Sequence, residues 1–167
     1  MLNPGLISRI WASDIDPDML GVAGRNLSLL TRSGMETRIA QLRRLYERYE
    51  KPVHLEAIAS ARRLMVKLPE AVSVKLFQAD VMAGLSLAGP PDVIITDVPY
   101  GNLVQWQGQA GDLDRFMAGL LSVSGNETVI AVCMDKRQKL NPAGIQRLDR
   151  ATVGKRKFEI YRACTSG

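Results

Sequence analysis

Three short apolar runs that each lead into an aspartate constrain this fold more than any other feature of the sequence. The aspartates that follow the runs are Asp14, Asp80 and Asp97. Each run is nearly continuous in apolar residues, which is typical of a strand buried on both faces of a parallel sheet. Segments with helical periodicity separate the runs. The pattern therefore predicts an α/β sheet, mostly parallel, with helices on both of its faces.

The remaining elements follow from periodicity and from start and stop signals. We expect helices over residues 17–30, 39–49, 52–68, 112–123 and 141–150, and strands over residues 7–14, 72–77, 92–96, 127–134 and 157–164. Asp16 and Pro17 are typical of a helix start, and Ser33-Gly34 is expected to end that first helix. We expect one domain over residues 1–167, with a helical pair inserted at residues 34–70.

The three aspartates predict a ligand site at one edge of the sheet. Ligands of parallel α/β sheets bind beyond the carboxyl ends of the strands, which is where Asp14, Asp80 and Asp97 are placed. A carboxylate can accept both hydroxyls of a ribose, and a second one can accept from an adenine amine. The alternative is that each aspartate only stabilises a turn or a helix start.

The motifs at these strand ends, in their order along the chain, resemble class I S-adenosylmethionine-dependent methyltransferases. They are Ser13-Asp14-Ile15-Asp16-Pro17, Asn26, Gln78-Ala79-Asp80 and Asp97-Val98-Pro99-Tyr100-Gly101. The resemblance implies a Rossmann-like sheet that binds S-adenosyl-L-methionine. It implies that Asp14, beside Asp16, holds the cofactor's ribose and that Asp80 contacts its adenine. Asp97, also counted as a cofactor contact, begins the segment that matches the motif of enzymes methylating exocyclic base amines.

The chemistry of amine methylation explains the residue types from Asp97 to Gly101. An exocyclic amine is a poor nucleophile, and acceptors aimed at its N–H bonds orient it toward the methyl donor. The Asp97 carboxylate and the backbone carbonyl of Val98 are the expected acceptors. Pro99 makes the loop rigid, Tyr100 offers a ring on which the base stacks, and Gly101 allows close backbone approach.

A more specific resemblance covers nearly the whole chain. The segments that carry it are Lys51-Pro52 with Leu55-Glu56-Ala57, Ala61-Arg62-Arg63-Leu64, Trp106-Gln107-Gly108-Gln109 and Glu159-Ile160-Tyr161-Arg162-Ala163. They are similar to the AviRa family of rRNA methyltransferases. That family implies methylation of 23S-type ribosomal RNA, here expected at guanine N2, and avilamycin-type antibiotic resistance. It also implies that Trp106 and Gln107 line the substrate side of the site.

The charge distribution agrees with an RNA partner. Nine Lys and Arg lie between Lys136 and Arg162, opposed by two acidic residues. Such a basic block is an electrostatic footprint of nucleic acid, and its alternative is a solvated face without a polyanion partner. The phosphate contacts that we predict are Arg43, Arg44, Lys136 and Arg137. The sequence has no run of 18 apolar residues, so no membrane span is predicted. The two cysteines do not have the spacing of a zinc site. We therefore expect a cytoplasmic monomer without a metal.

One part of the class I pattern is not found in this sequence. The pattern begins with a strand and a glycine-rich loop that wraps the methionine end of the cofactor, and only nine residues precede Ile10. We therefore expect a sheet without its first strand and glycine-rich loop. Two hypotheses stay open: an rRNA methyltransferase, and a catalytically inactive truncated remnant or RNA-binding module. A nicotinamide-dependent dehydrogenase is a weaker third, because the segment from Asp97 to Gly101 does not fit it.

Overall fold

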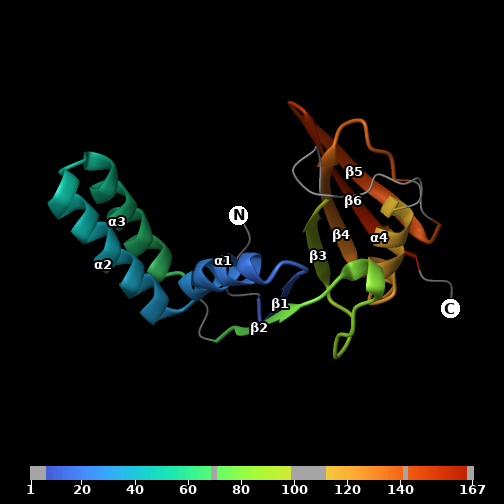
Figure 1. Cartoon of the computed structure of the whole chain (residues 1–167), viewed down its shortest axis with the longest axis horizontal. Helices are drawn as coiled ribbons and strands as arrows, with labels where there is room; N and C mark the ends of the chain where they lie inside the picture. Colours follow the sequence, from blue (N-terminus) through green and yellow to red (C-terminus); the bar gives the residue numbers. More distant parts are fainter. Residues whose placement is uncertain (1–6, 69–70, 99–111, 141–142, 165–167) are drawn as a thin grey trace. The chain divides into compact units, whose positions relative to one another are not determined.

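A computed structural model of the chain describes residues 7–68, 71–98, 112–140 and 143–164. It has two compact units, Met1–Gln78 and Ala79–Gly167, and each is described by itself. Both units combine helices with strands, so the predicted α/β class is confirmed (Figure 1). The single domain and the inserted pair at residues 34–70 stay predictions.

The first unit contains a two-stranded parallel sheet and the helix that connects its strands. Strand β1 (Arg9–Asp14) pairs with β2 (Ser73–Gln78) in a continuous parallel register. Helix α1 (Pro17–Leu27) follows β1, and the side chain of Asp16 caps it by accepting from the backbone N–H of Asp18. Leu76 of β2 lies against Gly24 of α1, which places α1 on one face of this sheet.

The rest of the first unit is a helical hairpin. A short 3-10 turn, η2 (Ser28–Leu30), leads into α2 (Arg32–Tyr49), and α3 (Pro52–Met65) returns beside it. The expected helix end at Ser33-Gly34 is wrong, because both residues lie in the first turn of α2. A Cβ on Gly34 would lie 2.0 Å from the carbonyl oxygen of Ser28. Gly34 therefore allows α2 to pack closely on η2 and does not end a helix. The hairpin buries Met35, Ile39, Leu42, Ile58 and Ala61 between its helices.

The second unit is a four-stranded mixed sheet in the order β3-β4-β6-β5. Strand β3 (Val93–Asp97) pairs in parallel with β4 (Val129–Asp135). Strand β6 (Arg156–Ala163) then pairs antiparallel with β4 and also with β5 (Ile145–Val153). Among the described residues, two of the four strand pairings are therefore parallel and two are antiparallel.

Helix α4 (Asp112–Leu121) covers one face of this sheet, and the main core lies beneath it (Figure 1). The core contains Val98, Phe116, Met117, Leu120, Ile130, Val132, Met134, Leu140 and Tyr161. Another 3-10 turn, η3 (Val81–Ala83), packs so closely on α4 that a Cβ on Gly119 would lie 2.0 Å from the carbonyl oxygen of Val81. None of the helices in the described part of the chain is long and apolar enough to cross a membrane.

The helix expected over residues 141–150 is wrong, because residues 145–153 form strand β5. A β-bulge between Arg147 and Asp149 interrupts the pairing of β5 with β6. An extra residue in a strand reverses the alternation of side chains beyond it. Arg147 and Arg150 consequently share one face of the sheet although they are three residues apart. In the sequence, a spacing of three between residues of one face is also typical of a helix.

Candidate active site

The candidate catalytic aspartate, Asp97, lies at the carboxyl end of β3. Its side chain is 53% exposed, so it is accessible to a ligand. Val98, the next residue, is fully buried in the main core, and its backbone N–H donates to the carbonyl oxygen of Cys133 at 2.8 Å. This anchors the strand end to β4 directly after Asp97. Because the Val98 side chain is in the core, only its backbone carbonyl is left for the predicted contact with substrate.

Two neighbours of Asp97 were not predicted from the sequence. Asp97 is the register partner of Cys133 on β4, and the thiol forms a side-chain hydrogen bond with the carboxylate. Burial raises the pKa of the Cys133 thiol, and the charge and hydrogen bond of Asp97 raise it further. Arg156, at the start of β6, brings Nη1 within 3.9 Å of an Asp97 oxygen. Cys133 lies within β4 and Arg156 begins β6, so no shared sequence signal points to the two residues.

Asp14, Asp16 and Asp80 each use one carboxylate oxygen in a local turn. Asp14 accepts from the backbone N–H of Asp16 at 2.9 Å, and Asp16 accepts from that of Asp18 at 2.8 Å. Asp80 caps η3 by accepting from the N–H of Met82 at 2.8 Å. Asp14 and Asp16 thus lie together beyond β1 in the first unit, and Asp80 follows β2 in the second. These turns fix the backbone of each acid and leave its other oxygen for a ligand hydroxyl or amine.

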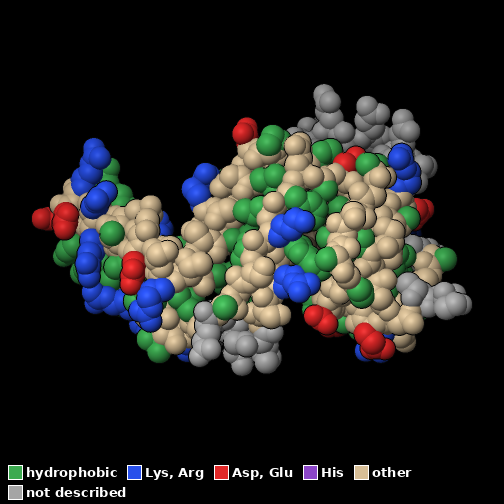
Figure 2. Space-filling view, turned by 90° about the horizontal axis from the view of Figure 1, so that it is seen from below, with side chains coloured by type: hydrophobic (Ala, Val, Ile, Leu, Met, Phe, Trp, Pro, Cys, Tyr) green, Lys and Arg blue, Asp and Glu red, His purple; other side chains and the backbone are tan. Residues whose placement is uncertain are grey.

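Four of the other predicted site residues are exposed cations. Arg43 and Arg44 lie on the surface of α2, where neither is within 4.0 Å of a described carboxylate. Figure 2 shows Lys and Arg side chains over the hairpin. Lys136 and Arg137 follow β4, and Arg137 is bound to Asp135 by a 2.9 Å ion pair. Hydrogen bonds from the Arg137 side chain and backbone lower the pKa of the Asp135 carboxyl.

The remaining predicted site residues lie outside the described part of the chain. They are Pro99, Tyr100, Gly101, Trp106 and Gln107. Within the described part, no group of three or more His, Cys, Asp or Glu could hold a metal ion.

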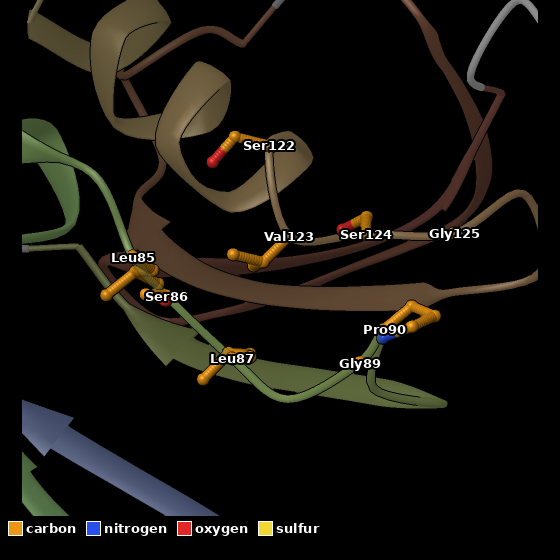
Figure 3. Close-up of a pocket in the computed structure, with 9 residues that line it drawn as sticks. All are labelled: Leu85, Ser86, Leu87, Gly89, Pro90, Ser122, Val123, Ser124 and Gly125. Atoms are coloured by element: carbon orange, nitrogen blue, oxygen red, sulfur yellow. The ribbon is translucent and has the colours of Figure 1, made fainter.

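A recess of about 370 Å³ lies in the second unit, at the end of β3 opposite to Asp97 (Figure 3). Its lining residues are Leu85, Ser86, Leu87, Gly89, Pro90 and Ser122 to Gly125. These residues precede β3 and β4 or follow α4, so the recess is at the amino ends of the two parallel strands. It has no ionisable side chain in its lining, and we do not assign the active site to it.

Comparison with known proteins identifies the family of the chain. The family profile described as rRNA methyltransferase AviRa matches residues 1–156. A 23S rRNA (guanine(2535)-N(1))-methyltransferase from Streptomyces viridochromogenes is 33% identical over 173 aligned positions, which cover 98% of this chain and 69% of that relative.

Solved structures agree with this comparison. Two structures of the rRNA methyltransferase AviRa from the same organism match with TM-scores of 0.75 and 0.76 at 34% identity. The matches cover 93% and 92% of this chain and 66% and 65% of those chains, so the chain spans about two thirds of their length. A putative methylase from Haemophilus influenzae shares the fold at 11% identity and a TM-score of 0.51, over 95% of this chain and 74% of its own. The resemblance seen in the sequence is confirmed: the chain belongs to the AviRa family of rRNA methyltransferases, a family of enzymes.

Proposed function

We propose that this chain carries the function of its family, the S-adenosyl-L-methionine-dependent methylation of a guanine base in 23S-type rRNA. The observation that supports the proposal most strongly is the 33% identity to a 23S rRNA guanine methyltransferase over 98% of the chain. The proposed fold is the Rossmann-like class I sheet of S-adenosyl-L-methionine-dependent methyltransferases. The parallel pairs β1–β2 and β3–β4 are compatible with it.

The acids at the strand ends suit the proposed cofactor. S-adenosyl-L-methionine supplies an electrophilic methyl group on its sulfonium. Asp14, with Asp16 beside it, would hold the ribose hydroxyls, and Asp80 would accept from the adenine amine. Each of these carboxylates has one oxygen in a turn and a second oxygen directed to no described partner, which is the acceptor geometry that a nucleoside requires.

Asp97 has the central role in the proposed reaction. Its carboxylate would accept from the N–H groups on the Watson–Crick edge of guanine, and the carbonyl of Val98 would be the second acceptor. Arg156, 3.9 Å away, limits the positions that the Asp97 side chain can adopt. Orientation of this kind accelerates transfer because the reacting atoms are held in line. Tyr100 and Gly101 would contact the flipped base, with Trp106 and Gln107 on the same side.

The methylated atom is N1 or N2 of guanine. The sequence favours the exocyclic N2, whereas the relative from Streptomyces is named for N1. The two atoms are adjacent on one base edge, and both carry a hydrogen in neutral guanine. At N2, Asp97 would orient the amine, and the methylated nitrogen would release its extra proton to the Asp97 carboxylate or to solvent. At N1, Asp97 would also take up the N1 proton as a general base, because the ring nitrogen must lose that proton to become nucleophilic.

The remaining parts of the proposal follow from the rRNA substrate. Arg43, Arg44, Lys136 and Arg137 would contact phosphates of the RNA. The location would be cytoplasmic, the chain would act as a monomer, and methylation would confer resistance to avilamycin-type antibiotics. An inhibition assay on a sensitive strain that expresses the chain tests the resistance.

The decisive experiment is methyl transfer from labelled S-adenosyl-L-methionine to unmodified large-subunit rRNA, with the product nucleoside identified by mass spectrometry. Asp97→Ala is expected to lower transfer by at least about a hundredfold and to weaken cofactor binding, measured by calorimetry, far less than that. Asp92→Ala, an exposed aspartate directly before the same strand, is the matched control and should keep full activity. Full transfer by Asp97→Ala would contradict the assigned role. RNA binding without any cofactor binding would instead favour the inactive remnant or RNA-binding module.

A further inference from the structure

Strand β5 presents two arginines on the same face of the sheet because of its bulge. Beyond the bulge, Arg150 pairs with Glu159, and before it Arg147 pairs with Tyr161. Glu159 and Tyr161 are two residues apart on β6 and therefore share a face. In a regular strand, residues at an odd spacing would point to opposite faces. The extra residue in β5 thus directs Arg147 and Arg150 toward the same buried carboxylate.

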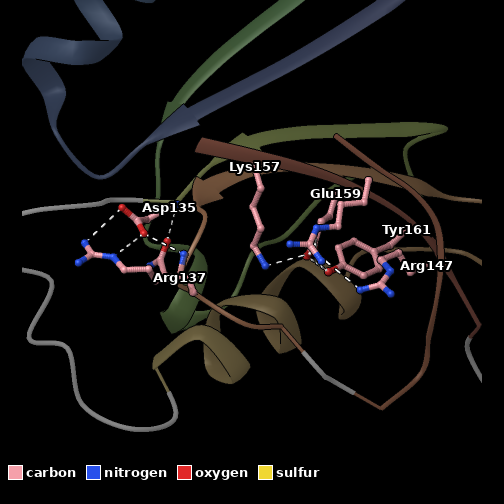
Figure 4. A network of polar contacts seen from close by, with 8 residues as sticks. Asp135, Arg137, Arg147, Lys157, Glu159 and Tyr161 are labelled. Carbon is pink, nitrogen blue, oxygen red and sulfur yellow. Dashed lines mark hydrogen bonds and ion pairs between the residues drawn. The ribbon is translucent and has the colours of Figure 1, made fainter. Parts of the chain in front are cut away.

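The carboxylate of Glu159 is the centre of a charged network (Figure 4). Its Oε1 atom lies 3.2 Å from Nζ of Lys157, 3.7 Å from Nη1 of Arg147 and 3.7 Å from Nε of Arg150. Its Oε2 atom accepts a hydrogen bond from the Tyr161 hydroxyl. Burial raises the pKa of the Tyr161 hydroxyl, and its bond to Glu159 raises it further. Tyr161 therefore remains a donor throughout the physiological range.

The network leaves excess positive charge at the surface. Three cations share one carboxylate, and Asp149 on β5 pairs with Ile160, which places it on the opposite face of the sheet. Lys157 and Glu159 are 4% and 2% exposed, whereas the side chains of Arg147 and Arg150 are 55% and 51% exposed. A buried carboxylate thus holds the inner part of each guanidinium in place. The outer N–H groups of both arginines face solvent from one edge strand.

We propose that Arg147 and Arg150 form a preorganised site for an RNA backbone phosphate, with Glu159 as its buried anchor. Guanidinium groups bind phosphate oxygens through pairs of parallel N–H donors, which two neighbouring arginines on one strand can provide. Prior ordering by Glu159 lowers the side-chain entropy lost when the phosphate binds. This inference rests on the proposed rRNA function and adds to it a contact surface in the second unit.

The test measures binding of a fluorescein-labelled stem–loop RNA by anisotropy at several salt concentrations. Arg147→Ala/Arg150→Ala is expected to weaken binding by at least about tenfold. It should also flatten the slope of log K against log salt by about 0.7 to 0.9, because one phosphate is no longer neutralised. Lys155→Ala/Arg162→Ala removes the same charge from the same β5–β6 hairpin. This control should weaken binding only slightly, because Arg162 lies on the other face and Lys155 in the turn.

Two further variants separate a preorganised site from general attraction. Arg147→Lys/Arg150→Lys keeps both charges but loses the paired donors, and it should bind RNA severalfold more weakly than the wild type. Glu159→Gln removes a negative charge, so general attraction predicts tighter binding, whereas loss of the anchor predicts weaker binding. Circular dichroism establishes whether Glu159→Gln folds, and the lysine variant decides the question if it does not.

The outcomes separate this inference from the proposed function. Equal losses in the Arg147→Ala/Arg150→Ala variant and its control would overturn the phosphate site, while the methyl-transfer assay would still test the enzyme. Wild-type binding of RNA followed by specific loss in the double alanine variant would support the site even if Asp97→Ala kept its activity. Failure of the wild type to bind the RNA would contradict both.

Discussion

Asp97 shows how much the meaning of one residue depends on its neighbours in space. The sequence identifies it as an acid at a strand end, followed by a valine, a proline and a tyrosine. The structure adds a thiol on one side and a guanidinium on the other, from β4 and β6. Both neighbours are more than 35 positions away in the sequence, so no local pattern could indicate them. The thiol gives a way to test the position of Asp97 without measuring activity.

This test uses the reactivity of Cys133. Burial and the charge of Asp97 raise the pKa of its thiol, so little reactive thiolate is expected near neutral pH. Asp97→Asn should lower that pKa and make alkylation of Cys133 by iodoacetamide faster at mildly alkaline pH. Mass spectrometry of the alkylated peptides measures the rate, and the exposed Cys164 is the internal control. An unchanged Cys133 rate would show that Asp97 does not interact with the thiol.

Glu159 connects the charged network to acid stability. Burial alone would raise the pKa of its carboxyl, but hydrogen bonds from Tyr161 and Lys157 and the nearby charges of Lys157 and Arg147 outweigh this and lower the pKa. A carboxyl whose pKa is lower in the folded state stabilises the protein above its unfolded pKa of about 4.3. That stabilisation is lost as the pH falls through the lower, folded pKa.

Glu159→Gln should therefore remove this acid dependence. It should also lower the free energy of unfolding near neutral pH by about 3–5 kcal/mol, because it leaves buried Lys157 without its counter-charge. Urea denaturation at a series of pH values measures both effects. A variant with the same stability as the wild type at pH 7 and at pH 4 would contradict the assigned network.

At the scale of elements, the strands with apolar runs were predicted well and β5 was not. The expected strands at residues 7–14, 92–96 and 127–134 agree with β1, β3 and β4 within one or two residues. Nothing in the sequences of these strands resembles helical periodicity. β5 is an exposed edge strand with a bulge, so burial does not enforce a period of two in its sequence. The period of three between Arg147 and Arg150 therefore resembled a helix.

Close packing between elements gives a prediction at Gly119 of α4. A Cβ there would lie 2.0 Å from the carbonyl oxygen of Val81, so Gly119→Ala must separate α4 from η3. We expect a loss of about 1–3 kcal/mol in the free energy of unfolding. Gly21→Ala in α1 is the matched control: its Cβ would meet only an Arg25 side-chain atom at 3.7 Å, and helix propensity predicts a gain of up to about 1 kcal/mol. Chemical denaturation compares the two, and equal effects would argue against the packing described.

For the whole molecule, charge is the property most relevant to an RNA partner. The chain has 22 Lys and Arg against 17 Asp and Glu, a net charge of +5. If Arg43, Arg44, Lys136 and Arg137 each neutralise a phosphate, affinity for an rRNA fragment should fall by about fiftyfold between about 50 and 200 mM salt. Anisotropy titrations measure this dependence. Replacing all four with alanine should leave only the smaller salt dependence that Arg147 and Arg150 contribute. A wild-type affinity that is insensitive to salt would exclude phosphate binding.

The sequence by itself determined the α/β class, the family, and the acids at the strand ends. These depend on short-range signals: apolar runs, the aspartates that follow them, and motifs a few residues long. Only the tertiary structure decided that β5 is a strand and that Arg156 and Cys133 adjoin Asp97. Only the tertiary structure shows that Arg147 and Arg150 both form ion pairs with the buried carboxylate of Glu159. These features depend on pairing between strands and on a bulge, and strand register joins residues that have no fixed spacing along the chain.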